Sequence, residues 1–456
     1  MKTTVKCLDL IKFHRKPGNF LTETLPFEAP TCPPNLRNSR PTRRLHKCRI
    51  LWLVSLLVCP AETNAQNNTA TGTGALNSNT TGEFNTAHGF QTLFHNTTGS
   101  YNTAHGAQAL FSNQSGVYNS ALGVNALYFN NSGSYNLALG YESLYYNANG
   151  SFNTSTGYQA LYFNESGSFN TANGYQALSV NKSGTDNSAF GFQALAQNAT
   201  GDRNTASGSH SLFTNDTGSE NVGNGYYSLK VNISGLRNVA LGAYALERNV
   251  SGNYNTAGGY KALANTTSGD NTAFGRNALL TNIGGRSNTA LGSGADVTAG
   301  SLTNATAIGA NAKVSTSNTV RIGNSSVTSV KAQVPLSATS DVRLKTQIAN
   351  LTLGRDFINR LRPVEYVRKN NLDATKEWGL IAQEIEQTLK DFDYEAAGIV
   401  TTDGSSDQLL SVRYNDLLAP MIKTLQQQDA MLQQQDATIT SLLKRIEALE
   451  KTDSLK

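Results

Sequence analysis

Between residues 68 and 303, the hydrophobic and polar positions of the chain recur with a period of 17. Asparagine marks the start of 14 units, at positions 68, 85, 102, 119, 136, 153, 170, 187, 204, 221, 238, 255, 271 and 288, with a single 16-residue step before 271. Gly follows four places later in all 14 units, and Leu follows eight places later in the first 13. A short fixed period of this kind is typical of a solenoid.

The residue types within one unit favour strands over helices. A unit such as 102–118 carries two glycines and two asparagines, which are poor helix formers. Short apolar segments such as Ala126–Phe129, bounded by Asn-x-Ser-Gly, are typical of strands joined by tight turns. We therefore predict a mainly β fold, a parallel β-roll or β-solenoid whose coils each point one Leu and one Ala inward. At about 4.8 Å per coil, the 14 coils extend on the order of 65 Å, and their ends need caps or partner chains.

Two recurring features of the units allow alternative interpretations. The Asn-x-Ser/Thr triplets match a glycosylation sequon, but they lie where Asn and Gly suit a turn, and we favour turn chemistry. The aromatic residues that end many units either pack between coils or chains, which we favour, or form an exposed ladder for a glycan or cell-surface ligand. These residues are Tyr101, Tyr118, Tyr135, Phe152 and Phe169.

From about Ser340 the repeat gives way to the mixed pattern of a small globular α+β region. One set of apolar positions suits an amphipathic helix that would end at Pro363. The set is Ile348, Leu351, Phe357, Ile358 and Leu361. A second helix is predicted over about Leu380–Leu389.

Between Leu418 and Leu449 the apolar residues fall into heptads, which predict a coiled coil. One row is Leu425, Leu432, Ile439 and Ile446, and the other is Gln428, Gln435, Leu442 and Leu449. The two Gln layers would weaken packing while fixing register, and they are compatible with a trimer. Such a helix requires partner chains.

The N-terminal part has the features of a secretory signal. The apolar run at residues 50–58 follows several basic residues and precedes the small residues Thr63–Ala65, and it is too short to span a bilayer. We expect cleavage near Ala65 and a secreted or cell-surface mature chain without an integral membrane segment. A lipoprotein interpretation of Cys59 is disfavoured because the bulky Val58 precedes it.

Composition narrows the possible functions of the mature chain. All four cysteines lie before Ala65, so the mature chain can form no disulfide or thiolate metal site, and we expect no metal and no cofactor. The first 65 residues hold 11 Lys/Arg and 4 Asp/Glu, which leaves 26 and 28, or a net charge of −2. The net charge of +5 therefore comes from the leader, and nucleic-acid binding is not expected.

The segment Ser340–Lys345 places a hydroxyl five residues before an amine that could deprotonate it. No histidine follows His210, which excludes a Ser-His-Asp triad within this region. On a regular helix, five residues lie about 140° apart, so the pair must meet through an irregular turn or across a subunit interface. The alternative is that Ser-Asp only caps a helix and that the basic residues are solvated.

Two parts of the chain resemble known families. Residues 304–314 and 318–323 are similar to the head-and-neck repeat of trimeric autotransporter adhesins, which implies a left-handed parallel β-roll assembled as a homotrimer. The period of 17 departs from the shorter repeat of that family. About 115 residues from Ser340 resemble the self-cleaving intramolecular chaperone domain of endosialidases and phage tail spikes. The matching segments are Ser340–Lys345, Leu361–Tyr366, Gly379–Glu384 and Leu410–Tyr414, followed by the helical tail.

The second resemblance implies roles for particular residues. Ser340 would be the nucleophile and Lys345 its base, and the bond between Thr339 and Ser340 would be cut once, with no turnover of external substrates. The other motif residues carried over from the family are Asp341, Arg343, Gly379, Gln383 and Glu384.

The patterns and resemblances together divide the chain into five parts. These are a leader at 1–65, 17-residue repeats at 66–303, an adhesin-like repeat and linker at 304–339, a self-cleaving chaperone domain at 340–417 and a coiled coil at 418–456. The leading hypothesis is a secreted homotrimeric fibre or adhesin-like protein whose C-terminal domain drives assembly and then cuts itself off. The alternative is a stalk that keeps this domain as a trimer foot. A carbohydrate-active enzyme is disfavoured because the repeats hold too few acids for a recurrent carboxylate pair.

Overall fold

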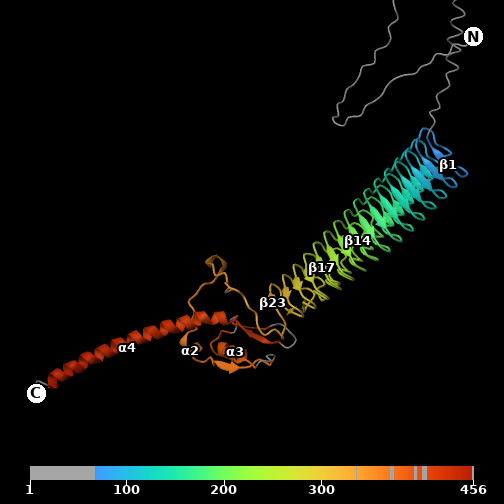
Figure 1. Ribbon diagram of the computed structural model, residues 1–456. Coiled ribbons are helices and arrows are strands. Elements are labelled where there is room, and N and C mark those ends of the chain that lie inside the picture. The colour runs from blue at the N-terminus through green and yellow to red at the C-terminus, as the bar shows by residue number, and fades with distance from the viewer. Residues whose placement is uncertain (1–66, 335, 370–373, 395–397, 403–407, 454–456) are drawn as a thin grey trace, which may run out of the picture. The chain divides into compact units, whose positions relative to one another are not determined.

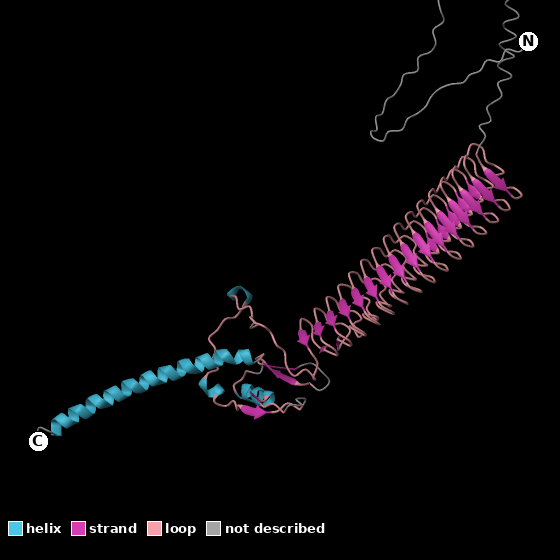
Figure 2. Ribbon diagram, in the orientation of Figure 1, coloured by secondary structure: helices cyan, strands magenta, loops and turns pink. Residues whose placement is uncertain are grey.

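The computed structural model describes residues 67–334, 336–369, 374–394, 398–402 and 408–453. The predicted secretory signal and its cleavage site lie outside these residues. Figures 1 and 2 show a long stack of short strands between β1 and β23, and a separate set of helices and short strands that follows it in the chain.

The repeats form a parallel β-solenoid of about 15 coils, as predicted. Its larger sheet has 16 strands, and each coil pairs with the next at equivalent positions, for example Ala104 with Ala121. The strands are β1 (Thr69–Thr71), β2 (Thr86–His88), β3 (Thr103–His105), β5 (Ser120–Leu122), β7 (Leu137–Leu139), β9 (Thr154–Thr156), β11 (Thr171–Asn173), β13 (Ser188–Phe190), β14 (Thr205–Ser207), β15 (Val222–Asn224), β16 (Val239–Leu241), β17 (Thr256–Gly258), β18 (Thr272–Phe274), β19 (Thr289–Leu291), β21 (Thr306–Ile308) and β23 (Val320–Ile322).

Two smaller parallel sheets form from two-residue strands elsewhere in the coils. The first contains β4 (Ser112–Asn113), β6 (Phe129–Asn130), β8 (Tyr146–Asn147), β10 (Phe163–Asn164) and β12 (Val180–Asn181). The second pairs β20 (Asp296–Val297) with β22 (Lys313–Val314).

The solenoid core is narrow and repeats from coil to coil. In one coil it holds Asn102, Ala104, Ala109, Leu110 and Asn113, none of which has exposed surface. The prediction of one Leu and one Ala per coil was therefore incomplete, because a second Ala and two asparagines are also buried. Polar side chains can be buried in this way only if they are hydrogen-bonded.

The predicted strand Ala126–Phe129 was wrong over most of its length. Only Phe129 belongs to a strand, and Leu127 has a φ of 52°. A coil of 17 residues must reverse direction within a few residues, and this left-handed conformation at Leu127 makes the bend while its side chain stays in the core. The regular strand lies elsewhere in the unit, at the small residues that follow the first asparagine.

The buried asparagines connect each coil to its neighbours. The Asn102 and Asn113 side-chain amides both donate to the Gly116 carbonyl at 2.9 Å. Asn113 Nδ2 also donates to Asn96 Oδ1 of the preceding coil at 2.7 Å. Asn113 begins a sequon, yet its amide nitrogen is buried and donates twice, so the folded coil has no room for a glycan there. This supports the turn interpretation of the Asn-x-Ser/Thr triplets.

Glycine is required where these asparagines converge. A Cβ atom at Gly116 would lie 2.3 Å from the Gly133 carbonyl oxygen and 2.4 Å from Asn130 Nδ2. Real Cβ contacts are longer than this, so any side chain would push adjacent coils apart. The recurrent Gly of the Asn-x-Ser-Gly segments is therefore fixed by packing between coils.

The aromatic residues that end the units stack on one another along the solenoid. The rings of Phe84, Tyr101, Tyr118, Tyr135, Phe152 and Phe169 follow at centroid distances of 4.8 to 5.0 Å, nearly parallel. Packing between coils is confirmed. These side chains are also 43% to 57% exposed, so they do form an exposed row. Each inner ring is nevertheless covered on both faces by its neighbours, and this disfavours the glycan-ladder interpretation because a sugar stacks on a free ring face.

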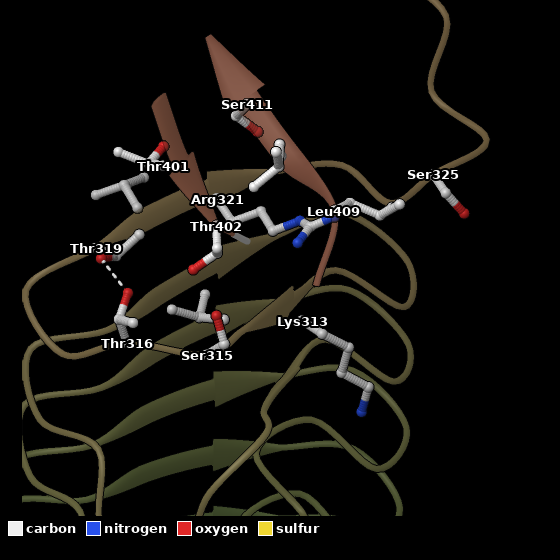
Figure 3. Close-up of a pocket in the computed structure, with 13 residues that line it drawn as sticks. Lys313, Ser315, Thr316, Thr319, Arg321, Ser325, Thr401, Thr402, Leu409 and Ser411 are labelled. Carbon is white, nitrogen blue, oxygen red and sulfur yellow. Dashed lines mark hydrogen bonds between the residues drawn. The ribbon is translucent and has the colours of Figure 1, made fainter. Parts of the chain in front are cut away.

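The adhesin-like residues 304–323 continue the same sheet. Thr289 of β19 pairs with Thr306 of β21, which pairs with Val320 of β23. In these last coils the Lys313 ammonium lies 3.2 Å from Asp296. The hydroxyls of Thr316 and Thr319 are hydrogen-bonded at 2.8 Å, as Figure 3 shows.

The residues after 340 form a small α+β region. It contains the 3-10 helix η1 (Val342–Leu344), α2 (Arg355–Ile358), the antiparallel pair β24 (Val364–Tyr366) and β25 (Glu377–Gly379), α3 (Ala382–Asp391), the antiparallel pair β26 (Val400–Thr402) and β27 (Leu410–Val412), and the 3-10 helix η2 (Tyr414–Leu417). Its core consists of Leu353, Phe357, Ile385, Leu389, Ile399 and Leu417.

Of the two helices predicted in this region, the second is present and the first is not. The helix expected over Leu380–Leu389 is present as α3, shifted by two residues. The long amphipathic helix before Pro363 was wrong, since only the four residues of α2 are helical. Gly354 lies at its N-cap in a non-helical conformation, and Gly is a poor helix former. Phe357 and Leu353 reach the core without a longer helix.

The predicted coiled-coil segment is one continuous helix, α4 (Leu418–Asp453). The apolar residues of its heptads are exposed, from 50% at Ile446 to 68% at Leu449. No helix within the described residues is both long enough and apolar enough to cross a membrane.

Candidate functional site

The segment Ser340–Lys345 folds into a tight turn around η1. Asp341 is the N-cap of η1, and its carboxylate accepts a hydrogen bond from the Arg343 backbone N–H at 2.9 Å. The Arg343 guanidinium closes the same turn, with Nη2 2.7 Å from Asp341 Oδ2. The Arg343 side chain, and then its backbone N–H, hold the pKa of Asp341 below its ordinary value. The charged carboxylate therefore fixes the turn.

This turn brings Ser340 and Lys345 together. The Lys345 ammonium donates a hydrogen bond to Ser340 Oγ at 2.6 Å. The chain enters and leaves the 3-10 turn in extended conformations, at Asp341 and Lys345, so both ends return to the same side. Of the two expected ways to bring the pair together, an irregular turn or a subunit interface, the η1 turn provides the contact within one chain. The helix cap is Asp341, which leaves the Ser340 hydroxyl to Lys345.

The Ser–Lys pair lies on an open surface of the chain. Thr339, Ser340 and Lys345 are exposed, and so are the apolar neighbours Val342 and Leu344, at 66% and 74%. None of these residues lines the pocket drawn in Figure 3. The distance suits a nucleophile and its base. In this arrangement, however, the ammonium donates to the hydroxyl, whereas a base must accept the hydroxyl proton.

The other motif residues support the fold of the region. Gly379 lies at the end of β25, where an added Cβ would be 2.5 Å from the Tyr414 hydroxyl. The same hydroxyl accepts a hydrogen bond from the Leu380 N–H at 3.0 Å. Tyr414 therefore ties the matched segment around Gly379 to the one that ends at η2. Only the position of Tyr414 within a family-like segment could have indicated this role from sequence.

Two motif residues lie on the first turn of α3. Glu384 forms an ion pair with Arg362, which precedes β24, whereas Gln383 is exposed. Within the described ranges, no hydrogen bond or ion pair joins Gly379, Gln383 or Glu384 to Ser340 or Lys345. The structure therefore brings together Ser340, Asp341, Arg343 and Lys345, whereas Gly379, Gln383 and Glu384 lie apart from them with contacts of their own.

Comparison with known proteins gives one match. Residues 340–394 match the family model described as chaperone of endosialidase. No curated protein and no solved structure matches the chain. The match begins at the serine of the Ser–Lys pair.

The class of protein follows from the match and the fold together. A chaperone-of-endosialidase segment follows a parallel β-solenoid, and this combination fits a tail-spike or adhesin-like fibre. The family implies an intramolecular chaperone that cleaves itself.

Proposed function

We propose that this chain is a secreted fibre or adhesin-like protein that assembles as a homotrimer and then cuts itself between Thr339 and Ser340. The observation that carries the proposal is the hydrogen bond between Lys345 Nζ and Ser340 Oγ, at the first residue of the matched family segment. The C-terminal region aligns three chains, and α4 holds them together through its heptad rows.

The cleavage chemistry balances with one water molecule. The neutral Lys345 amine takes the proton of the Ser340 hydroxyl, and Oγ attacks the carbonyl carbon of Thr339. The C–N bond breaks, and the leaving nitrogen takes the proton from Lys345 and becomes the Ser340 amine. Water then hydrolyses the ester between Thr339 and Oγ. The products are a Thr339 carboxylate and a chain that begins at Ser340.

Trimer assembly provides the uncharged Lys345 amine that cleavage needs and that a single chain lacks. Lys345 is exposed in one chain, and its charged ammonium cannot accept a proton. Val342, Leu344 and Ile348 lie within a few residues of the pair in sequence and are 66%, 74% and 68% exposed, so partner chains that cover this segment would also remove Lys345 from water. A drier site favours the uncharged amine. Cleavage therefore waits for the trimer.

The repeats explain why such a chaperone is useful. Near-identical coils can pair out of register, and such errors are slow to correct. A C-terminal domain that aligns the chains first removes this ambiguity. Once it is cut away, the stalk cannot easily reverse its assembly, which gives it kinetic stability.

The test is the intact mass of the purified full chain and of three variants. Wild type should give two fragments that separate between Thr339 and Ser340, whereas Ser340→Ala and Lys345→Gln should stay whole. Ser337→Ala is the matched control because Ser337 is an exposed serine of the same linker, and it should be cut like wild type. A wild-type trimer that stays whole overturns the cleavage proposal and favours the alternative, a stalk that keeps its C-terminal domain as a trimer foot.

A further inference from the structure

The 16-stranded sheet leaves one of its faces uncovered. The middle residue of most of its strands is a buried Ala, and the residues on either side of it point outward. Parallel sheets normally have both faces covered. In this chain, the outward face has no layer of helices or strands from the solenoid over it (Figure 2).

Near the C-terminal end of the solenoid, from β16 to β23, the outward face carries a large apolar side chain on every strand except β17. From β16 to β23 its large apolar side chains are Leu241, Phe274, Leu291, Ile308, Val320 and Ile322. Five of them are 42% to 65% exposed, and Ile308 is half-buried. The outward positions of these strands hold no charged residue. We call this set the apolar sheet face.

We propose that the apolar sheet face packs against the same face of the other copies of this chain. The proposal rests on the proposed homotrimer and names the surface along which its stalks meet. A face without charges is self-complementary, because identical copies bring together no like charges.

The apolar sheet face supplies part of the area that an interface requires. Six side chains of about 150–200 Å², roughly half exposed, remove about 500 Å² per chain from water. The Thr and Val side chains beside them, such as Val239 and Thr289, raise this towards the ~800 Å² per partner of a standard interface. A glycan would need hydrogen-bonding groups on this face, and beyond these threonine hydroxyls its side chains offer none.

The same chain exposes apolar residues in α4 and in the linker that partner chains would cover. The heptad residues of α4 are exposed, and so are Val330, Val334 and Leu336 in the linker after the solenoid. Three chains side by side would cover all of these surfaces in one event. The occupant of the apolar sheet face is therefore a second and a third copy.

The apolar sheet face also favours one register between neighbouring chains. The third residue of each strand changes from coil to coil. Here Leu241 is followed by Gly258 and then by Phe274, whose ring occupies the space beside Gly258, since a Cβ at Gly258 would lie 2.5 Å from it. This irregular order of small and large residues matches itself only when the chains are aligned. The face would hold the stalk together after α4 has been cut away.

The experiment compares two substitutions that place a charge on different sides of neighbouring coils. Leu291→Asp alters the apolar sheet face, and Ile283→Asp alters an exposed apolar residue in a turn of the preceding coil. Light scattering across a dilution series of the full chain should show Leu291→Asp dissociating at a concentration at least tenfold higher than wild type. Ile283→Asp should behave like wild type, and circular dichroism checks that both variants keep the solenoid.

A second variant pair covers the case in which Leu291→Asp misfolds. In a chain whose four native cysteines are replaced by serine, Leu291→Cys should form a disulfide-linked dimer on oxidation, whereas Ile283→Cys should not. The wild type could be a trimer whose Leu291 variants dissociate and cross-link no differently from the Ile283 variants. That result overturns the proposed packing of the apolar sheet face and leaves the proposed function standing. A monomeric wild type overturns both.

Discussion

Removing one buried asparagine of the solenoid should weaken several coils at once. Asn130 has no exposed surface, and its amide donates to Asn113 Oδ1 at 2.7 Å and to the Gly133 carbonyl at 2.8 Å. Its own oxygen accepts from Asn147 Nδ2 at 2.7 Å. Asn130→Ala removes three hydrogen bonds, and it leaves the Asn113 oxygen without its donor in a buried site.

The magnitude follows from these contacts. Each lost hydrogen bond costs about 1 kcal/mol, and the orphaned acceptor adds about 1–3 kcal/mol, so the local free energy of opening should fall by roughly 4–6 kcal/mol. The Gly133 carbonyl and the Asn147 amide nitrogen keep one partner each, Asn119 Nδ2 at 2.9 Å and the Gly150 carbonyl at 2.8 Å, which limits the loss.

Hydrogen exchange measured by mass spectrometry is the suitable assay, because long repeat arrays need not unfold in a single step. Protection of coils 102–152 should drop by about 100-fold or more in Asn130→Ala. Asn131→Ala is the matched control, since Asn131 is the exposed next residue, and it should change protection little. The reasoning is refuted if the two variants differ by less than about 1 kcal/mol.

Further predictions concern other parts of the chain. Gly116→Ala should disrupt the solenoid, because its Cβ would overlap the Gly133 carbonyl. Gly284→Ala should be tolerated, because Gly284 has open space around it. Thermal unfolding of the two variants checks this. Gln428→Leu with Gln435→Leu should raise the dissociation temperature of the assembly by replacing two polar layers, and an unchanged temperature argues against a coiled coil. Because the pKa of Asp341 is depressed, its carboxylate stabilises the η1 turn fully above the ordinary pKa of 3.8, and this stabilisation is lost as pH falls through the lower pKa of the folded turn. An NMR titration should therefore show the turn intact at mildly acidic pH. Asp341→Asn should abolish that transition.

Much of the solenoid was predictable because its restraints repeat in the sequence. The period, the β class and the stacking of Tyr101 on Tyr118 follow from residues that recur at fixed positions. The burial of Asn113 was not predictable from a single unit. Its partners, Asn96 and Asn130, lie one coil away on either side. The sequence of one unit therefore indicates an ordinary turn residue, and the hydrogen bonds that bury Asn113 form only when the coils are stacked.

The candidate site was predictable in its residues but not in its geometry. The five-residue spacing of Ser340 and Lys345 indicated an irregular turn, and η1 provides it. Which residue of the segment caps the helix could be assigned only from the structure. Asp341 is the N-cap of η1, although the sequence allowed Ser340 equally well. The long helix before Pro363 failed because apolar spacing alone cannot distinguish a helix from a loop whose side chains, such as Leu353, reach the core.

The contacts of the Gly116 carbonyl have a consequence for the evolution of the chain. The core asparagines of a coil, such as Asn113, are hydrogen-bonded within their own coil and to the two adjacent coils, so these contacts do not depend on how many coils there are. A duplication or deletion of one whole unit would leave each remaining contact unchanged. Even the 16-residue unit fits, because the Ser268 carbonyl replaces that of the glycine and accepts from Asn255 Nδ2 at 2.8 Å. The length of this stalk is thus free to vary by one coil at a time, about 4.8 Å per step, without any redesign of its interior.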